Sequence, residues 1–169
     1  MEEKFVFQHY LMFGGNCEEA LKTYEKAFGG KIVELCRYGD MEGFSEKEEQ
    51  KNLIMHSTFV LGDGNIMCAD YPYKTTPGDN AFVMPPFKTV DEVKKAWDVL
   101  KEDATIIEDL APCFFAEIYG TLRDKYGINW MLMIEKKAEC TCTAACASGY
   151  NPDCTCTHPE CHCREANEK

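Results

Sequence analysis

Two amphipathic helices with the same start signal constrain the fold of this chain more than any other sequence feature. The first is predicted over residues 17–28, where Asn16 can cap the free amides of the first turn and Gly29 ends the helix. The second is predicted over residues 90–102, with Thr89 as its cap. Each cap is followed three residues later by a glutamate, which completes a capping box, and each helix carries one apolar stripe. Such stripes must be buried against other elements, so the chain contains two similar packing units.

Eight short segments with an apolar period of two, or with a short apolar run, are predicted to be strands. They are Phe5–Phe13, Lys31–Tyr38, Ile54–Leu61, Asn65–Tyr71, Ala81–Met84, Thr105–Leu110, Phe114–Leu122 and Ile128–Ile134. The order along the chain is therefore strand, helix and three strands, and the same order follows again. We predict an α+β fold of tandem βαβββ modules at about residues 5–72 and 80–135, within a domain of residues 1–137.

The charge of the chain limits its partners. Its 29 acidic and 18 basic residues give a net charge of −11, which makes nucleic acids and anionic membranes poor partners. No apolar run approaches the roughly eighteen residues that a membrane span needs. Residues Met1–Phe7 contain no apolar core of a secretory signal, so we expect a cytoplasmic protein with reduced thiols.

The segment 138–169 has a composition unlike the rest of the chain. It contains seven of the eleven cysteines and no Leu, Ile, Val, Phe, Met or Trp, so it cannot build a hydrophobic core. Closely spaced thiols with nearby imidazoles are typical of soft-metal sites and resemble metallothionein chemistry. We therefore predict an irregular metal-binding tail whose ligands are Cys140, Cys142, Cys146, Cys154, Cys156, His158, Cys161, His162 and Cys163.

Metal binding would decide whether this tail is ordered. Fixing about thirty residues costs on the order of 1–2 kcal/mol each, whereas one structural zinc ion contributes roughly 10–16 kcal/mol. The predicted ligands suffice for two tetrahedral zinc sites, with copper(I) or cadmium as alternative metals. Two other interpretations stay open. One is a framework of disulfides, against which the odd number of tail cysteines argues, and the other is a disordered tail that binds metal adventitiously.

Four stretches of the body resemble one known protein family. They are Tyr10–Gly30, Arg37–Asp40, Ile54–Thr58 and Tyr119–Met131. Through them the chain is similar to the PhnB-like branch of the vicinal oxygen chelate superfamily, over roughly residues 5–135. The resemblance implies that the modules curve into a mixed-sheet cup, that two chains form a homodimer, and that a small organic molecule binds in the concavity. It does not extend to the tail.

The superfamily includes metal-dependent enzymes, which place His, Glu and Gln on the strands that line each cup. The resemblance puts His9 at the place of the first-strand ligand, and Cys68 or Met67 at that of the first module's carboxylate. Asn80 and Met131 occupy the two corresponding places of the second module. Met and Asn are poor ligands for a hard divalent ion, so we expect no metal cofactor in the cup. A softer ion held by His9 and Cys68 together is the alternative.

Family members contact their ligands from the strands that line the cup, above all from the last strands. The pocket candidates that this resemblance implies are His9, Cys68, Phe114, Glu117, Tyr119 and Trp130. Glu117 is the only carboxylate in its strand run, so it is the candidate pocket acid by elimination. The aromatic members belong either to the pocket or to the core. His56 begins a strand and is expected to be structural, with a role as general base as the alternative.

These observations support three functions of different classes. The first is a homodimeric cup that binds a small organic molecule of unknown identity without necessarily transforming it. The second is a glyoxalase-type lyase, isomerase or transferase that acts on a small metabolite or antibiotic. The third, compatible with either, is a metal-handling role for the tail. Resemblance in fold does not choose between binding and catalysis.

Overall fold

The computed structural model describes residues 9–43 and 47–136. The elements in order are β1 (His9–Phe13), α1 (Cys17–Phe28), β2 (Lys31–Arg37), β3 (Ile54–Leu61), β4 (Gly64–Asp70), α2 (Val90–Leu100), β5 (Thr105–Ala111), β6 (Ala116–Arg123) and β7 (Asn129–Glu135). The chain divides into two units, Met1–Glu135 and Lys136–Lys169, and the tail predicted at 138–169 lies outside the described residues. No helix of the described part is long and apolar enough to cross a bilayer.

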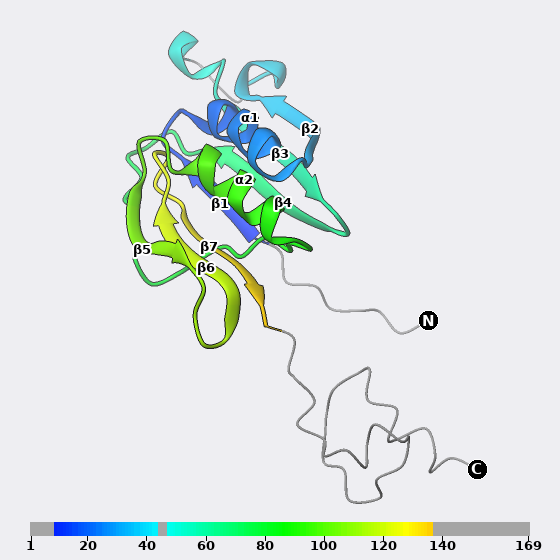
Figure 1. The fold of residues 1–169 in the computed structure, drawn as a ribbon. Helices are drawn as coiled ribbons and strands as arrows, with labels where there is room; N and C mark the ends of the chain where they lie inside the picture. The colour runs from blue at the N-terminus through cyan, green and yellow to red at the C-terminus, as the bar shows by residue number, and fades with distance from the viewer. Residues whose placement is uncertain (1–8, 44–46, 137–169) are drawn as a thin grey trace, which may run out of the picture. The chain divides into compact units, whose positions relative to one another are not determined.

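The strands form two sheets, one for each module (Figure 1). The first has the order β1-β4-β3-β2, with β1 parallel to β4 and the other pairs antiparallel. The second has the antiparallel order β5-β6-β7, and Val83 adds a parallel bridge to Trp130 of β7. Val83 therefore lies beside β7 as β1 lies beside β4. This arrangement confirms the α+β class and the tandem modules that the sequence predicts.

The first strand of the second module is shorter than predicted. The sequence predicted a strand over Ala81–Met84, but only Val83 makes a bridge. Its N–H donates to the carbonyl of Asn129 over 2.9 Å, and its carbonyl accepts from the N–H of Met131 over 3.0 Å. Two prolines follow at positions 85 and 86, and proline has no backbone N–H to donate to a ladder. The pairing cannot continue past them.

The N-terminus of α1 is capped by a residue from another element. The predicted cap, Asn16, makes no side-chain hydrogen bond to the helix. Instead, the buried Asp70 carboxylate at the end of β4 accepts hydrogen bonds from the N–H of Gly15 over 3.0 Å and from that of Cys17 over 2.9 Å. Its second oxygen accepts from the N–H of Ile54 over 2.9 Å. The capping box predicted at Asn16 is therefore wrong, and the first amide of the helix, that of Cys17, is bound by a charged acceptor from another element.

The remaining helix ends follow their local signals more closely. The Thr89 hydroxyl accepts from the N–H of Glu92 over 3.2 Å, and the Glu92 carboxylate accepts from the N–H of Thr89 over 3.2 Å. This is the predicted capping box. Gly29 ends α1 in the left-handed conformation, with φ of 76°. The second helix ends at Leu100, two residues before the predicted end.

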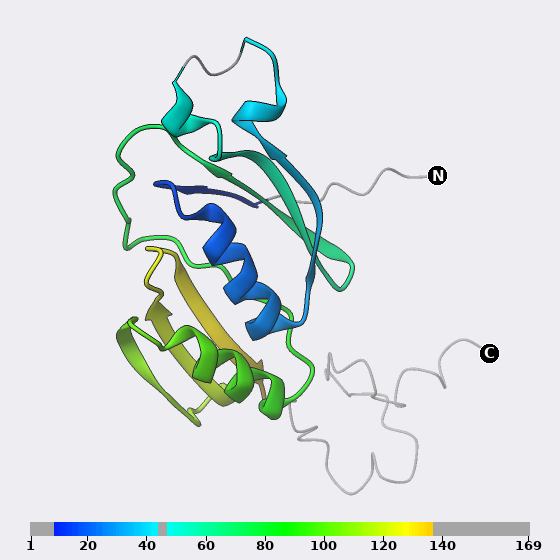
Figure 2. The same cartoon turned by 90° about the horizontal axis from the view of Figure 1, so that it is seen from above.

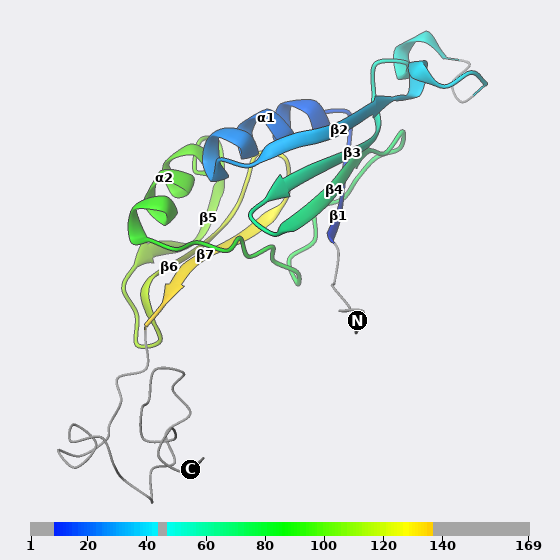
Figure 3. The same ribbon diagram turned by 90° about the vertical axis from the view of Figure 1, so that its right-hand side faces the viewer.

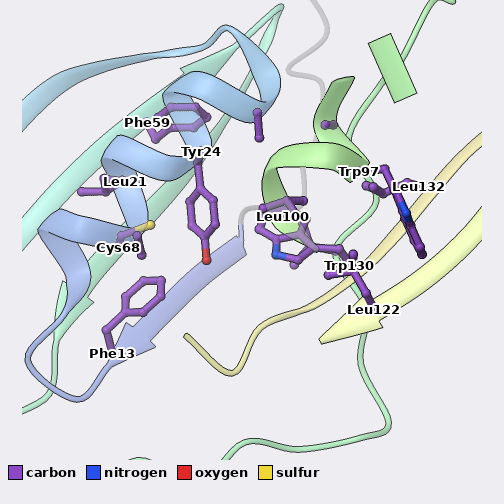
Figure 4. Close-up of a cluster of buried hydrophobic side chains, with 14 of the residues drawn as sticks. Phe13, Leu21, Tyr24, Phe59, Cys68, Trp97, Leu100, Leu122, Trp130 and Leu132 are labelled. Carbon is purple, nitrogen blue, oxygen red and sulfur yellow. The ribbon is translucent and has the colours of Figure 1, made fainter. Parts of the chain in front are cut away.

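Each helix covers one face of its own sheet, and the two helices lie side by side (Figures 2 and 3). Their apolar stripes and the inner sheet faces form one core (Figure 4). Its largest buried members are Phe13, Leu21, Tyr24, Ile54, Phe59, Leu100, Leu122, Trp130 and Leu132. The opposite face of each sheet is not covered by any helix in the described residues. We call these two uncovered surfaces the open faces.

The two modules are joined through the buried carboxylate of Asp124. One of its oxygens accepts from the Tyr24 hydroxyl of α1 over 2.8 Å and from the indole N–H of Trp130 over 2.7 Å. The other accepts from the backbone N–H groups of Tyr126 and Ile128, each over 2.9 Å. The rings of Tyr24 and Trp130 also meet edge to face, with centroids 5.0 Å apart. One residue thus ties α1 of the first module to β7 of the second.

Candidate functional site

Strand alternation decides which side chains lie on the open face of the first sheet. Phe59 of β3 is buried against the helix, so His56 and Thr58 of the same strand lie on the open face. The pairing register places Tyr10 of β1 and Glu34 of β2 in the same row across the sheet as Thr58. Four polar side chains from three strands therefore meet on this face.

These four residues, Glu34, Thr58, His56 and Tyr10, form what we call the first polar row. The Tyr10 hydroxyl lies 3.2 Å from Nδ1 of His56, and the two ring centroids are 6.0 Å apart. On the other side of the imidazole, Nε2 lies 3.5 Å from the Thr58 hydroxyl and 3.8 Å from the Glu34 carboxylate. The Thr58 hydroxyl lies 3.3 Å from the Glu34 carboxylate, to which it donates. The imidazole is thus held between a phenol and a carboxylate.

Apolar side chains surround the first polar row. Tyr10 is 45% exposed and Met12 is 40% exposed on the same strand, while the half-buried Met67 lies opposite both Tyr10 and Thr58. Partial burial raises the pKa of the Tyr10 phenol, which keeps this hydroxyl protonated at neutral pH. A few fixed polar groups among apolar contacts are typical of small-molecule sites.

A second polar row lies on the open face of the second sheet and consists of Glu108, Thr121 and Tyr119. The Glu108 carboxylate accepts from the Tyr119 hydroxyl over 2.6 Å and from the Thr121 hydroxyl over 3.2 Å. The hydrogen bond to Glu108 raises the pKa of Tyr119, so this phenol also stays neutral. Met131 of β7 lies opposite Thr121, as a methionine does in the first row.

The two rows occupy equivalent positions in the two modules. In each module a glutamate follows a shift of register and pairs with a threonine of the next strand: Glu34 with Thr58, and Glu108 with Thr121. The residue two positions before the threonine differs, because it is histidine in the first row and tyrosine in the second. The duplication therefore keeps the carboxylate and the hydroxyl, and it varies the group that can transfer a proton.

The structure separates the six pocket candidates predicted from the sequence. Cys68 is 1% exposed beneath α1, and Trp130 is fully buried (Figure 4). His9 is exposed at the start of β1, where alternation with Tyr10 places it on the side opposite to the open face. Tyr119 belongs to the second polar row. Of the candidates, Cys68, Trp130 and His9 thus lie away from the open faces.

The other two candidates lie near one end of the second sheet. Phe114 is 90% exposed in the connection between β5 and β6, because β6 begins only at Ala116 and not at the predicted position. The ring of Phe115 bridges Phe114 and Tyr119, with centroid distances of 4.9 Å and 5.2 Å. Glu117 is exposed and lies at the register shift between Ala116 and Ile118 of β6, two residues before Tyr119.

The described residues contain no cluster of three or more metal-ligating side chains. Within residues 9–43 and 47–136, no three His, Cys, Asp or Glu side chains come together as a ligand set. The predicted alternative pair, His9 and Cys68, lies on the helix-covered face of the first sheet, with Cys68 buried in the core and His9 exposed at the start of β1. Metal binding by this pair stays a prediction. The nine tail ligands predicted from the sequence, Cys140, Cys142, Cys146, Cys154, Cys156, His158, Cys161, His162 and Cys163, lie outside the described residues.

Sequence reasoning missed most members of the two polar rows. It singled out His56 as a structural residue and Tyr119 as a pocket candidate, but it did not identify Tyr10 or either glutamate. The shifts of register before Glu34 and Glu108 decide which face these carboxylates share with the threonines, and a sequence does not show such shifts. The available signal was a repeat, since each glutamate follows an isoleucine by two residues.

The fold, with two βαβββ modules and their open faces, is that of the glyoxalase/bleomycin-resistance class, also called vicinal oxygen chelate proteins. A family model described as 3-demethylubiquinone-9 3-methyltransferase matches residues 5–133, so the chain belongs to this family. The curated protein YjdN of Escherichia coli is 23% identical over 138 residues, which cover 76% of this chain and 94% of that protein.

Solved structures share the fold of the chain. Protein PA1353 of Pseudomonas aeruginosa is 27% identical with a TM-score of 0.70, over 78% of this chain and 98% of that one. The PhnB protein of Bacillus cereus, named as a 3-demethylubiquinone-9 3-methyltransferase, is 27% identical with a TM-score of 0.60, over 77% and 99%. A glyoxylase/bleomycin resistance protein/dioxygenase domain from Frankia is 13% identical with a TM-score of 0.57, over 80% and 100%, and shares the fold alone.

Proposed function

We propose that the protein binds a small organic molecule on the open faces of a homodimer. The observation that carries this proposal is the first polar row, in which a phenol, an imidazole and a carboxylate are held together on a sheet face without a covering helix. Membership of the family and the fold shared with the glyoxalase/bleomycin-resistance class support a ligand site on this face. The second polar row supports it further, because the same arrangement recurs in the other module.

The chemistry of the first row suggests the class of ligand. The Glu34 carboxylate accepts hydrogen bonds, the Tyr10 hydroxyl donates, and His56 does either according to its tautomer. Met12 and Met67 beside them offer polarizable apolar surface that suits a flat ring. We expect a planar molecule with hydroxyl or carbonyl groups on its ring, such as a quinol or a hydroxylated aromatic acid.

A second copy of the chain would cover the open faces. The open face of the first sheet carries exposed apolar side chains such as Tyr10 and Met12, and β2 and β5 are outer strands of their sheets. Uncovered strand edges and apolar surface favour association of two copies. Light scattering at micromolar concentration should give twice the chain mass of 19.2 kDa. A stable monomer would contradict the dimer.

Proton transfer is the second candidate function, and the alignment of Tyr10, His56 and Glu34 favours it. General acid–base catalysis uses an imidazole that a neighbouring carboxylate stabilises when it gains a proton. Here the carboxylate lies 3.8 Å from one ring nitrogen and the phenol 3.2 Å from the other. Lyase and isomerase reactions of the glyoxalase type begin with such a proton removal.

Ligand-observed NMR of the full chain tests the binding proposal. Catechol, 4-hydroxybenzoate and 2-hydroxy-1,4-naphthoquinone serve as probes, and saturation transfer should be weakened in Glu34→Gln and in His56→Gln. Glu102→Gln is the matched control, since this exposed carboxylate lies in the turn after α2. Equal signals for all four proteins, or none for any probe with the wild type, would contradict ligand recognition by the row.

Product formation separates the two candidate functions. The wild type and His56→Gln are incubated with the hemithioacetal of methylglyoxal and glutathione, and with fosfomycin and glutathione. A third mixture of S-adenosylmethionine and a demethylated ubiquinol follows from the description of the family. Turnover that His56→Gln abolishes would support an enzyme, and binding without turnover would support a binding protein.

We also propose that the tail binds two or more soft metal ions, zinc first, in the reducing cytoplasm. The support is its composition, because closely spaced thiols pre-place ligands whose deprotonation is coupled to metal binding. Native mass spectrometry of the reduced protein at micromolar free zinc should show the bound ions, and the double change Cys154→Ser and Cys156→Ser should lower their number. No retained ion would refute this proposal.

A further inference from the structure

A pocket of about 570 Å³ lies on the helix-covered side of the protein, apart from the open faces. The end of α1, the β3–β4 hairpin, the segment before α2 and the start of α2 line it. Its volume lies within the range of about 300–1,000 Å³ that is typical of ligand sites. We propose that this pocket is a second ligand site, for a compact amphipathic carboxylate with an aromatic body.

The floor of the pocket is apolar and partly aromatic. The rings of Phe28 and Phe87 lie with their centroids 6.2 Å apart, and Leu61 adds an aliphatic wall. All three are only partly buried, so they retain apolar surface for a ligand. A flat ring on this floor would gain both apolar burial and contact with aromatic faces.

The hairpin wall of the pocket contains two residues without a side chain, Gly62 and Gly64, beside Leu61 and Asp63. Gly62 needs its left-handed backbone, with φ of 59°, for the turn. Gly64 has no such requirement, and a Cβ placed there would meet only the Leu61 carbonyl, at 3.7 Å. Gly64 is paired with Leu61 and lies on the same face of the hairpin, and both residues line the pocket, so a large side chain at position 64 would enter the pocket.

The rim of the pocket places two lysines on the side of α2. Lys88 and Lys95 line the pocket, and within the described part of the chain neither ammonium group forms a salt bridge. The nearby Glu92 carboxylate is engaged with the backbone N–H groups of Lys88 over 2.7 Å and of Thr89 over 3.2 Å. The other acidic group of the lining, Asp63, belongs to the opposite hairpin. A carboxylate on the α2 side would therefore meet two cations above an aromatic floor.

Binding of 2-naphthoate to the full chain tests this proposal. Trp130 reports it, because its ring lies 4.9 Å from Phe28 in the pocket floor, and isothermal titration calorimetry gives the affinity. Gly64→Phe should weaken binding by about tenfold or more because the new ring occupies the same volume. Lys95→Gln should weaken it about threefold, the effect of one exposed charge. Lys94→Gln, which makes the same change on α2 outside the pocket lining, is the matched control.

The neutral analogue 2-naphthamide should bind the wild type more weakly than 2-naphthoate does. Its affinities for Lys95→Gln and Lys94→Gln should equal each other. The comparison of Lys95→Gln with Lys94→Gln holds even where Gly64→Phe fails to fold, because the Lys95 side chain is exposed and has no packing role. Full affinity in a folded Gly64→Phe variant, or equal affinities for 2-naphthoate in the two lysine variants, would overturn the proposal. Loss of binding in His56→Gln would also overturn it, because the ligand would then occupy the open face.

Discussion

Replacing Asp124 by asparagine should destabilise the protein through the junction of its modules. The carboxylate accepts four hydrogen bonds, two from the side chains of Tyr24 and Trp130 and two from backbone amides of its own turn. Asparagine has the same shape but only one acceptor oxygen. Whichever way its amide is turned, its NH₂ group faces a pair of donors, and only the Tyr24 hydroxyl can reverse its role and accept.

The size of the effect follows from the donors that lose their acceptor. If the new amide faces the junction, the Trp130 indole N–H is left without a partner, and if it faces the turn, two backbone N–H groups are. A buried polar group without a partner costs about 1–3 kcal/mol, and the lost hydrogen bonds were made to a charge. We therefore expect the free energy of unfolding to fall by about 3 kcal/mol in Asp124→Asn and by more in Asp124→Ala.

Urea unfolding at one fixed protein concentration measures this change, with tryptophan fluorescence and far-UV circular dichroism as the two signals. Asp98→Asn is the control, because this exposed carboxylate forms only a surface pair with Lys101, whose loss costs about 1 kcal/mol or less. Tyr24→Phe with Asp124→Asn should cost less than the sum of the two single changes, since they share a hydrogen bond. A destabilisation of Asp124→Asn no larger than that of Asp98→Asn would refute the role of Asp124 as a junction.

Four further expectations come from buried groups and caps. Asp70→Asn should lower the free energy of unfolding by about 2 kcal/mol in the same urea assay, because fewer of the three amide donors to this side chain keep an acceptor. Thr89→Ala should lower the free energy of unfolding by about 1 kcal/mol, because the cap of α2 is lost. Burial raises the pKa of Tyr24 well above its ordinary value, so this tyrosine ionises first in the unfolded chain. The contribution of its neutral form to the free energy of unfolding is fully present below about pH 10 and is lost as pH rises further. The loss should be smaller in Tyr24→Phe. If the two proteins lose stability equally across that range, this account of Tyr24 is incorrect. A hydrogen bond to Cys68 and burial raise the pKa of Cys17, so peptide-resolved alkylation of the native protein should leave both thiols unmodified until denaturant is added, and rapid labelling of either would contradict their packing.

Local sequence determined the elements whose causes are local. The helix over residues 17–28 was predictable from its apolar period and its terminal glycine, and the start of the second at Val90 from its Thr89 cap, because these signals act within a few residues. The order of strands and helices then gave the tandem modules. The second module's first strand shows the limit of this reasoning, because its apolar run predicted a strand and the prolines after it left a single bridge at Val83.

Tertiary structure decided the groups that act across elements. Asp70 replaces Asn16 at the start of α1 only because β4 ends beside that helix, 53 residues further along the chain than Cys17. The same holds for the candidate site. His56 meets Tyr10 and Glu34 because the four strands of the first sheet pair in one register and a shift in β2 turns the carboxylate onto the open face. A one-residue change of register would move a side chain to the other face of the sheet, and only the packed fold determines that register.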